Sequence, residues 1–314
     1  MLGRSAWGLF WMARYLERAE NTARLLDAGF RMALTRGKDA AGEEWRSLLV
    51  SLGLEADYAA DKADDYSGAA ISNWILRGSQ GSSVLAMMEA ARTNARMVRT
   101  ALTREVWEAT NESWMILKDA LARPVKEADL GHVLDLIRRQ VTAVRGAMEG
   151  TMLRNDIFNF ARIGTHLERA DNTARILDVK YHVLLPSVAW VGSRLDNAQW
   201  EMVLRSVSGE RAFRWLNAGA LDPKGIAEFL ILDRRFPRSL SYCYAKLTSD
   251  MAWLRRDYDE DTAAYRMQRA ASERLAQTTI AQVFDHGLHE FITDFIVTNR
   301  HIADAIAADY RFTE

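Results

Sequence analysis

The chain has 314 residues, and a typical domain size of about 150 residues allows one large domain or two ordinary ones. Its 41 Lys and Arg residues nearly balance 42 Asp and Glu residues, and the formal net charge of −1 gives no overall electrostatic attraction to nucleic acid or to anionic membranes. An apolar content of 49% with 26% charged residues is typical of a soluble globular protein and excludes a disordered chain.

Helical periodicity dominates the chain from its first residues onward. In the first segment, apolar residues recur at alternating spacings of three and four, which places them on one face of a helix. That face comprises Leu9, Met12, Leu16, Ala19, Ala23, Leu26 and Phe30. We expect further helices over 43–53, 82–120, 129–150, 155–185, 196–216, 223–233, 238–256, 263–278 and 280–310, with loops at 37–42, 57–68, 78–81, 186–195 and 257–262. No alternation of β-branched residues is long enough for a sheet, so the predicted fold class is all-α.

Proline and charge mark where segments end. The four prolines lie between the expected helices or at their starts, and Asp222 followed by Pro223 is typical of an N-cap and a first helical position. Near the N-terminus, Arg4 and Arg14 interrupt the apolar run before the roughly 20 apolar residues that a membrane span needs. No cleavage site of an export signal is visible. We therefore expect a cytoplasmic protein, and the single cysteine, Cys243, fits a reducing compartment.

A repeated motif divides the chain in two. Residues 16–27 read LERAENTARLLD and residues 167–178 read LERADNTARILD, with ten of the twelve positions identical and an offset of 151 residues. Fainter matches follow at offsets of 155 and 156, which is what a duplication with small loop insertions leaves. The sequence thus predicts an internally duplicated helical bundle with two pseudo-symmetric halves, 1–150 and 151–314, packed into one body.

Charged residues of the motif lie beside the apolar face of each helix. At about 100° per residue, Asp27 and Glu20 lie at the edge of this face, Arg24, Glu17 and Asn21 lie further round, and Arg18 points nearly away from it. In the second copy the equivalent residues are Asp178, Asp171, Arg175, Glu168, Asn172 and Arg169.

Two interpretations of these charges stay open. In the first, which we favour, they form interhelical salt bridges that join the two related helices. In the second, the two charged stripes line a polar cleft that binds a ligand or performs acid–base chemistry.

A third segment breaks the symmetry of the halves. Residues 89–99 place Arg92, Arg96 and Arg99 on one helix face, and two of their three counterparts in the second half are uncharged. A site for an anion needs only one basic wall, so Arg92, Arg96 and the nearby Asn94 are candidate binders of a carboxylate or phosphate. The alternative is a solvated or salt-bridged arginine face.

Motifs for metals and cofactors are weak or missing. His286 and His289 have a spacing of three, but neither charged repeat has a Glu-x-x-His pattern, and the arginines would oppose a cation. One cysteine excludes a multi-cysteine metal site. No phosphate-binding loop, dinucleotide fingerprint or nucleophile elbow occurs. We therefore expect no metal and no cofactor.

The sequence resembles the Alpha-E family. The likeness rests on WMARYLERAENTAR at 11–24, HLERADNTAR at 166–175, ARTNARMVR at 91–99, FPRSL at 236–240 and GLHEF at 287–291, in family order. One departure is Thr93, where an acidic residue is expected. By the family's Glu-Arg motif, the resemblance points to Glu17, Arg18, Glu168 and Arg169.

The resemblance implies a setting of ATP-dependent amide or peptide bond formation. Proteins of this family are typically encoded beside, or fused to, circularly permuted ATP-grasp ligases, often with a transglutaminase-like protein nearby. The leading hypothesis is an accessory protein that binds the ligase, a peptide or an amino-group substrate through a cleft between its halves. There Glu17, Glu20, Glu168 and Asp171 would hold an amine, and Arg92, Arg96, Arg24 and Arg175 would hold a carboxylate or phosphate.

Two other functions remain as alternatives. The chain is an enzyme if Glu17 or Glu168 acts as a general base, which requires a carboxyl pKa raised toward neutrality. It is a structural scaffold if both charged stripes are fully paired and enclose no cavity. Under the leading hypothesis, changing Glu17 and Glu168 to Gln together abolishes binding and leaves the melting temperature nearly unchanged, whereas a large drop favours salt bridges.

Overall fold

The computed structural model describes residues 3–35, 38–62, 65–182, 194–217 and 221–312, and within these ranges the chain is helical and has no strand. The all-α prediction is confirmed. The α-helices are α1 (Gly3–Thr35), α2 (Lys38–Leu52), α3 (Glu55–Lys62), α4 (Gly68–Arg77), α5 (Val84–Met97), α6 (Arg104–Ala120), α7 (Glu127–Thr151), α8 (Asp156–His182), α9 (Arg194–Ser206), α10 (Glu210–Leu216), α11 (Pro223–Leu232), α12 (Leu240–Tyr258), α13 (Ala263–Gln277), α14 (Ile280–His286) and α15 (Leu288–Asp309), with a 3-10 helix, η1, at Arg99–Ala101.

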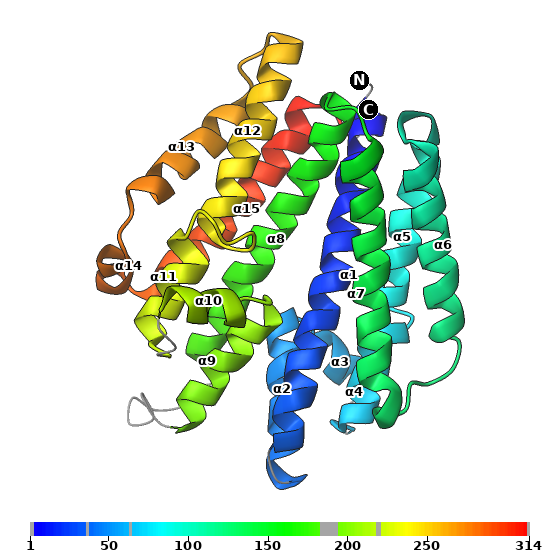
Figure 1. The fold of residues 1–314 in the computed structure, drawn as a ribbon, viewed down its shortest axis with the longest axis vertical. Coiled ribbons are helices and arrows are strands. Elements are labelled where there is room, and N and C mark those ends of the chain that lie inside the picture. Colours follow the sequence, from blue (N-terminus) through cyan, green and yellow to red (C-terminus); the bar gives the residue numbers. More distant parts are fainter. Residues whose placement is uncertain (1–2, 36–37, 63–64, 183–193, 218–220, 313–314) are drawn as a thin grey trace.

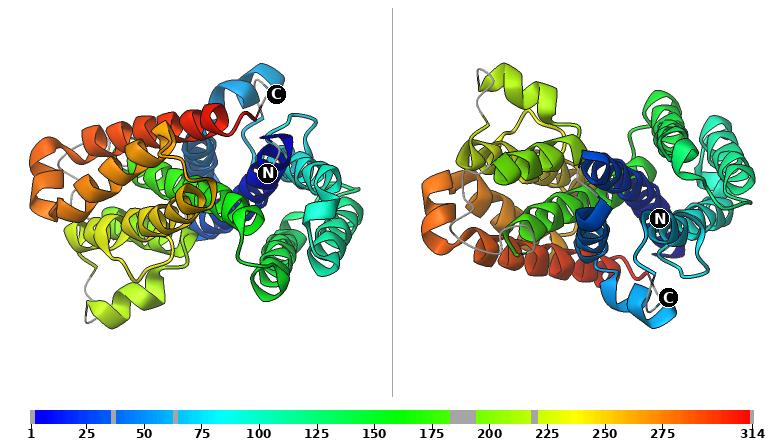
Figure 2. Two further views of the ribbon diagram at one scale, coloured as in Figure 1. Left: turned by 90° about the horizontal axis from the view of Figure 1, so that it is seen from above. Right: turned by 90° about the horizontal axis from the view of Figure 1, so that it is seen from below.

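Two long helices, α1 and α8, pack against each other in the centre of the molecule (Figure 1). On one side, α1 contacts α5 and α7, and α6 contacts both of these, so that the four helices form a closed bundle. On the other side, α8 contacts α12 and α15, and α13 contacts both of these, which forms a second bundle. The end views show the two bundles on opposite sides of the central pair (Figure 2).

Small residues let α1 and α8 approach closely. Ala19 and Ala23 on α1 and Ala170 and Ala174 on α8 are fully buried. Gly164 of α8 lies so close to α1 that a Cβ atom added there would be 2.3 Å from the carbonyl oxygen of Phe10. Because the distance between packed helices depends on the side chains at their contact, the lack of a side chain at Gly164 lets α1 and α8 come close enough for their motif side chains to meet.

The burial of α1 extends beyond the predicted apolar face. That face is confirmed, since Leu9, Met12, Leu16 and Leu26 are buried. However, α1 also packs against α2, α7 and α9, and the structure buries Glu17 and Asn21, which the sequence places well away from the face. More than one face of this helix is therefore buried, because neighbouring helices surround it.

Most predicted segments are helical, but several are interrupted. The segment 82–120 is divided by η1 and by Thr103, whose extended backbone and side-chain hydroxyl cap α6. The segment 196–216 breaks at Ser208 and Gly209, and the segment 280–310 breaks at Gly287, which has a φ of 101°. At such positions the chain turns through a conformation that glycine adopts most easily.

The predicted loops are correct in part. The loop at 57–68 is wrong over its first half, which belongs to α3, and residues 38–42 of the loop at 37–42 belong to α2. Most of the loop at 186–195 lies outside the described residues. The prediction at Asp222 and Pro223 is confirmed, since the Asp222 carboxylate accepts from the backbone N–H groups of Lys224 and Gly225 at the start of α11. No helix among the described residues is long and apolar enough to span a membrane.

Gly164→Ala should lower the free energy of unfolding by about 1–3 kcal/mol, because the new methyl group meets backbone rather than a movable side chain. Gly146→Ala is the matched control: nothing lies within 4 Å of its Cβ position in α7, so alanine should raise the free energy of unfolding by about 0.5–1 kcal/mol. Urea unfolding of both variants measures this. Equal effects at the two sites would contradict the close contact between α1 and α8.

Candidate functional site

The two Glu-Arg motifs bond to each other across the central helix pair. Arg169 of α8 donates to Glu17 of α1 through Nε and Nη2, at 2.9 and 2.8 Å. Conversely, Arg18 of α1 donates to Glu168 of α8 through Nε and Nη2, at 2.5 and 2.9 Å. Each glutamate thus holds the arginine of the other copy in a two-bond fork, the arrangement that arginine and carboxylate favour. Arg18 and Arg169, which the helical angle directs nearly away from the apolar faces, thus both meet a neighbouring helix.

Further arginines complete the pairing of these glutamates. Glu17 also accepts from Arg145 of α7 and from Arg238, which precedes α12, each at 2.8 Å. Glu168 also accepts from Arg14 at 2.7 Å. These residues, with the neighbouring Glu20 and Arg24, are called the Glu–Arg cluster: Arg14, Glu17, Arg18, Glu20, Arg24, Arg145, Glu168, Arg169 and Arg238.

Glu20 is bonded as fully as Glu17. Arg238 donates to it at 3.1 Å, Arg24 donates at 3.0 Å, and Arg145 donates to its other oxygen. Arg238 additionally donates to Oδ1 of Asn21 at 2.7 Å. The structure therefore supports the salt-bridge interpretation for the motif residues at the centre of the chain.

The electrostatics of the cluster oppose a general-base role. Burial raises the pKa of Glu17, but Arg169, Arg238 and Arg145 outweigh it and hold the pKa well below its usual value. Burial likewise raises the pKa of Glu168, and Arg14 and Arg18 reverse the shift, so that this pKa is also lowered. A general base working near neutral pH needs the opposite shift, so neither glutamate meets that requirement.

The expected effect of the Gln substitutions changes for the same reason. Glu17 is 1% exposed and Glu168 is 4% exposed, and each neutralises at least two guanidinium groups. Removing the Glu17 charge leaves the buried Arg169 uncompensated, which costs several kcal/mol. Removing the Glu168 charge leaves the partly exposed Arg14 and Arg18 uncompensated, which costs less because water screens them. A melting temperature that stays unchanged is therefore no longer the expected result for these variants.

The other motif residues form pairs along α1 and α8. Asp27 pairs with Arg31 and with Arg138 of α7, at 3.1 and 3.3 Å. Arg175 donates to Asp171 at 2.6 Å, and Asp178 lies 2.6 Å from Nδ1 of His289. The amine site proposed from four acidic residues would thus have to compete with arginines at every carboxylate.

The arginine face of α5 does not join the cluster. Arg92 donates to Oδ1 of Asn111 at 2.8 Å and lies over the ring of Trp114, both on α6, and Arg96 is exposed. Asn94 is buried, with its backbone carbonyl oxygen facing Gly8 of α1. The structure therefore separates Arg92 and Arg96 from Glu17 and Glu168. The anion site was suggested because these arginines have uncharged counterparts in the second half of the chain, and that difference does not indicate where their side chains point.

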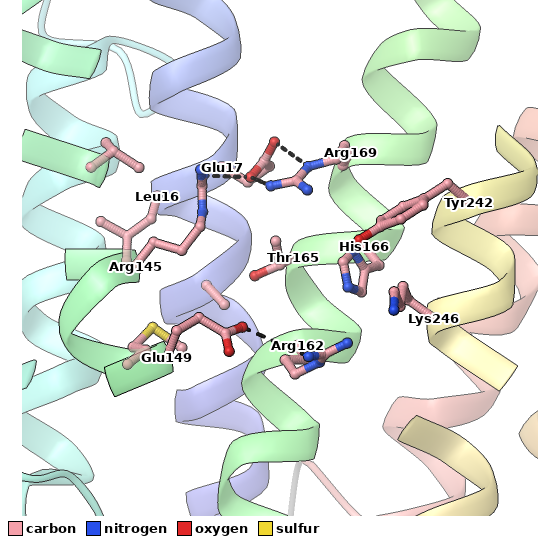
Figure 3. Close-up of a pocket in the computed structure, with 13 residues that line it drawn as sticks. Leu16, Glu17, Arg145, Glu149, Arg162, Thr165, His166, Arg169, Tyr242 and Lys246 are labelled. Atoms are coloured by element: carbon pink, nitrogen blue, oxygen red, sulfur yellow. Dashed lines mark hydrogen bonds and ion pairs between the residues drawn. The ribbon is translucent and has the colours of Figure 1, made fainter. Parts of the chain in front are cut away.

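A cavity of about 300 Å³ lies beside the cluster, between α1, α7, α8 and α12 (Figure 3). Arg145 and Glu149 reach it from α7, Arg162 and Arg169 come from α8, and the α12 side chains lie opposite α7 (Figure 3). We call it the central cavity. Its lining comprises Ala13, Leu16, Glu17, Val141, Arg145, Met148, Glu149, Arg162, Thr165, His166, Arg169, Tyr242 and Lys246.

Two polar groups of the central cavity have unused bonding capacity. Nδ1 of His166 is buried and has no hydrogen-bond partner among the residues that the structure describes. Burial, Arg169 and Arg162 hold the pKa of His166 well below its usual value, so the imidazole is neutral. Lys246 lies 5.2 Å from the centre of the Tyr242 ring and forms no ion pair with any described residue.

A second cavity, of about 240 Å³, lies on the Arg18 side of the helix pair. Six residues expected at a site line it: Arg18, Asn21, Glu168, Asp171, Asn172 and Arg175. The predicted stripes therefore border two cavities rather than one cleft. Nδ2 of Asn21 is buried without a partner in the described part of the chain.

Sequence reasoning missed the residues that come from outside the motifs. Arg145, Arg162 and Lys246 lie in ordinary helical segments and carry no local signal. Arg238 could have been predicted as a site residue, since it belongs to the FPRSL segment that resembles the family. Among the described residues, no group of three or more His, Cys, Asp or Glu side chains is arranged to hold a metal ion.

A helical chain with buried, cross-paired Glu-Arg motifs matches one protein family. The model of the Alpha-E family, described as a predicted alpha-helical domain with a conserved ER motif, covers residues 1–310, and the chain belongs to this family. Of its four Glu-Arg dipeptides, at residues 17, 168, 210 and 273, only those at 17 and 168 have a buried glutamate.

The similarity to curated proteins extends over nearly the whole chain. Uncharacterized proteins of Mycobacterium bovis and Mycobacterium tuberculosis are each 24% identical to the chain over 96% of its length. The chain spans 36% of the length of each of these curated relatives. No solved structure matches the chain significantly.

Glu17→Gln should lower the free energy of unfolding by about 3–5 kcal/mol, because it leaves the buried guanidinium group of Arg169 without a counter-charge. Glu168→Gln should lower it by a smaller amount, because its partners Arg14 and Arg18 are partly exposed and water screens their charges. Glu108→Gln is the matched control, since Glu108 pairs with Arg104 on the exposed surface of α6, where water screens the pair, and it should have little effect. Denaturant unfolding gives all three values. Motif variants as stable as the control would refute the structural role of the pairs.

His166 should make stability depend on pH. The unfolded chain takes up a proton at this imidazole near pH 6.5, whereas the folded chain keeps it neutral, so the stability it contributes is complete above that pH. As pH falls below 6.5, the wild type should lose up to about 1.4 kcal/mol per pH unit relative to His166→Gln. Urea unfolding at several pH values between 7.5 and 5 measures the difference. A difference that is the same at every pH would contradict the buried neutral imidazole.

Proposed function

We propose that this chain is an accessory protein of an ATP-grasp peptide or amide ligase system, and that it binds a peptide, an amine substrate or the ligase itself through the charged space beside α1 and α8. The observation that carries the proposal is the central cavity, which adjoins the Glu–Arg cluster and holds the unpaired Lys246. Small-molecule sites are typically concave and have a few convergent polar groups, and about 300 Å³ is within their range.

The Glu–Arg cluster and the central cavity differ in how fully their polar groups are bonded. This difference favours a ligand-binding function over a purely structural one. Scaffolding accounts for Glu17 and Glu168, whose bonds are satisfied by arginines. It does not account for an open, charged cavity in which Lys246 forms no ion pair with a described residue and His166 has a buried nitrogen without a described hydrogen-bond partner. Buried polar groups in proteins are normally bonded, so an exception suggests a missing partner.

Two further observations favour an accessory role over independent catalysis. The lowered pKa values of Glu17 and Glu168 remove the general base on which an enzyme mechanism was based. In the curated relatives, the matched region makes up only 36% of the chain, so there it is joined to a much longer sequence. A domain that forms part of a longer chain in its relatives is expected to act together with the rest of that chain, and here with a separate partner protein.

We also infer that the two bundles arose by duplication. The support is that α1, α5, α6 and α7 contact one another in the same order as α8, α12, α13 and α15, and that the motif copies lie on α1 and α8. The cross-paired Glu17–Arg169 and Glu168–Arg18 forks fit a two-fold relation between halves 1–150 and 151–314. A binding space between halves is then expected at their contact.

The proposed partners are a circularly permuted ATP-grasp ligase and, where one is encoded nearby, a transglutaminase-like protein. We place the partnership in the cytoplasm, where the buried thiol of Cys243 stays reduced. Nucleic acid and membrane are not among the proposed partners.

Co-expression of the chain with an ATP-grasp protein encoded beside it tests this function. We expect the two to co-purify, and the rate of ATP-dependent amide formation by the ligase to rise when the chain is added. Heat-denatured chain is the control for unspecific effects of added protein. The absence of such a neighbour, or a ligase that neither binds the chain nor changes its rate, would contradict the proposal.

A further inference from the structure

We propose that the central cavity recognises an oxyanion, a carboxylate or phosphate group of the ligand, through Lys246 of α12 and through Arg162 and His166 of α8. This inference deepens the proposed function and rests on the cavity that it assigns as the binding site. It assigns the binding of a carboxylate or phosphate, which the sequence suggested for Arg92 and Arg96, to a different set of basic residues.

The charge of the lining favours an anion. Four cationic side chains line the central cavity, namely Arg145, Arg162, Arg169 and Lys246, against the carboxylates of Glu17 and Glu149. Glu17 is already bonded to Arg145, Arg169 and Arg238. Of these four cations, Lys246 is the one that forms no ion pair within the described ranges, so its ammonium group is available to a ligand. The carboxylate of Asp250 also interacts electrostatically with Lys246, but it is bonded to Arg162 at 3.1 Å.

Of the ligands named in the proposed function, an amine therefore fits the central cavity less well than a group that carries an oxyanion. Glu149 lies 3.7 Å from Arg162 and 3.1 Å from Arg154, and Glu17 is 1% exposed. An amine in the central cavity would have to displace a guanidinium group from one of them, and it would meet Lys246 as a like charge. An oxyanion on Lys246 displaces no ion pair of that residue, because Lys246 forms none within the described ranges. At Arg162 it would share the guanidinium group with Asp250, which is bonded at 3.1 Å, and with Glu149 at 3.7 Å.

His166 gives an independent indication of a bonding partner. This residue is 7% exposed, lines the central cavity and has no partner for Nδ1 among the described residues. Its neutral ring carries one N–H group, which Nδ1 can present to an acceptor oxygen. Figure 3 shows His166, Tyr242 and Lys246 on the same side of the cavity, with Arg162 below them. An oxygen acceptor between these groups would satisfy His166 and Lys246 together.

The volume indicates that the oxyanion belongs to a larger ligand. About 300 Å³ is far more than a bare carboxylate or phosphate needs, and it approaches the lower limit of typical ligand pockets. Leu16, Val141 and Met148 line other parts of the same space and can contact an apolar portion. A small molecule or chain end with one oxyanion and a short apolar part fits both regions.

Titration of the purified full chain with sodium phosphate and with sodium acetate tests the inference, with sodium chloride at matched ionic strength as the blank. Isothermal calorimetry gives the affinity, and the imidazole signals of labelled histidine report on His166. We expect saturable binding of at least one oxyanion with a shift of the His166 signal. The tighter of the two identifies the ligand group as phosphate or carboxylate.

Lys246→Gln should weaken the oxyanion at least tenfold, as expected for the loss of one charge-assisted hydrogen bond. Lys118→Gln is the matched control, because Lys118 also lies over an aromatic ring, that of Trp114 on α6, but does not line the central cavity.

Unsaturable titrations with both salts, or equal affinity in the Lys246 and Lys118 variants, would overturn the oxyanion site. These outcomes need no ligase and are separable from the proposed function. A chain that binds phosphate or acetate but ignores the ATP-grasp protein contradicts only the accessory role, and the reverse result contradicts only the oxyanion site.

Discussion

The fold depends on the exchange of partners between two buried Glu-Arg motifs. Glu17 holds Arg169 and Glu168 holds Arg18, so each of the helices α1 and α8 supplies a counter-charge to the other. Because an unpaired buried charge is far costlier than an unmade apolar contact, this exchange fixes the register of the two helices. The small residues that allow close approach, such as Gly164 opposite Phe10, bring these charges within bonding distance.

That constraint also determines where binding can occur. Once arginines from α7 and from the segment before α12 satisfy Glu17, the conspicuous repeated residues have little capacity left for a ligand. The available groups are instead Lys246 and His166, which lie beside the cluster and belong to no repeat. The motif that characterises the family therefore organises the site, and less conspicuous neighbours make the contacts that we propose.

The sequence predicted the local features of the molecule better than its tertiary contacts. Periodicity located α1 and its buried face, and the repeat indicated which helices matter, because both depend on residues close in the chain. The burial of Glu17 escaped prediction, since a helical angle says nothing of how many neighbours surround a helix. Arg145 and Arg92 show that the sequence does not determine which helix an arginine contacts. No sequence pattern marked Arg145, yet it bonds to Glu17. Arg92 was a candidate anion binder, yet it bonds to Asn111 of α6.

A double-mutant cycle between Glu17 and Arg169 is the most direct test of this account. The free energies of unfolding of the wild type, Glu17→Gln, Arg169→Gln and the double variant give the coupling between the two side chains. For a buried pair that joins two helices, we predict a coupling of at least about 1.5 kcal/mol, with the double variant less destabilised than the sum of the single ones. Additive effects, with a coupling within about 0.5 kcal/mol of zero, would show that the exchanged pairs do not hold α1 and α8 together.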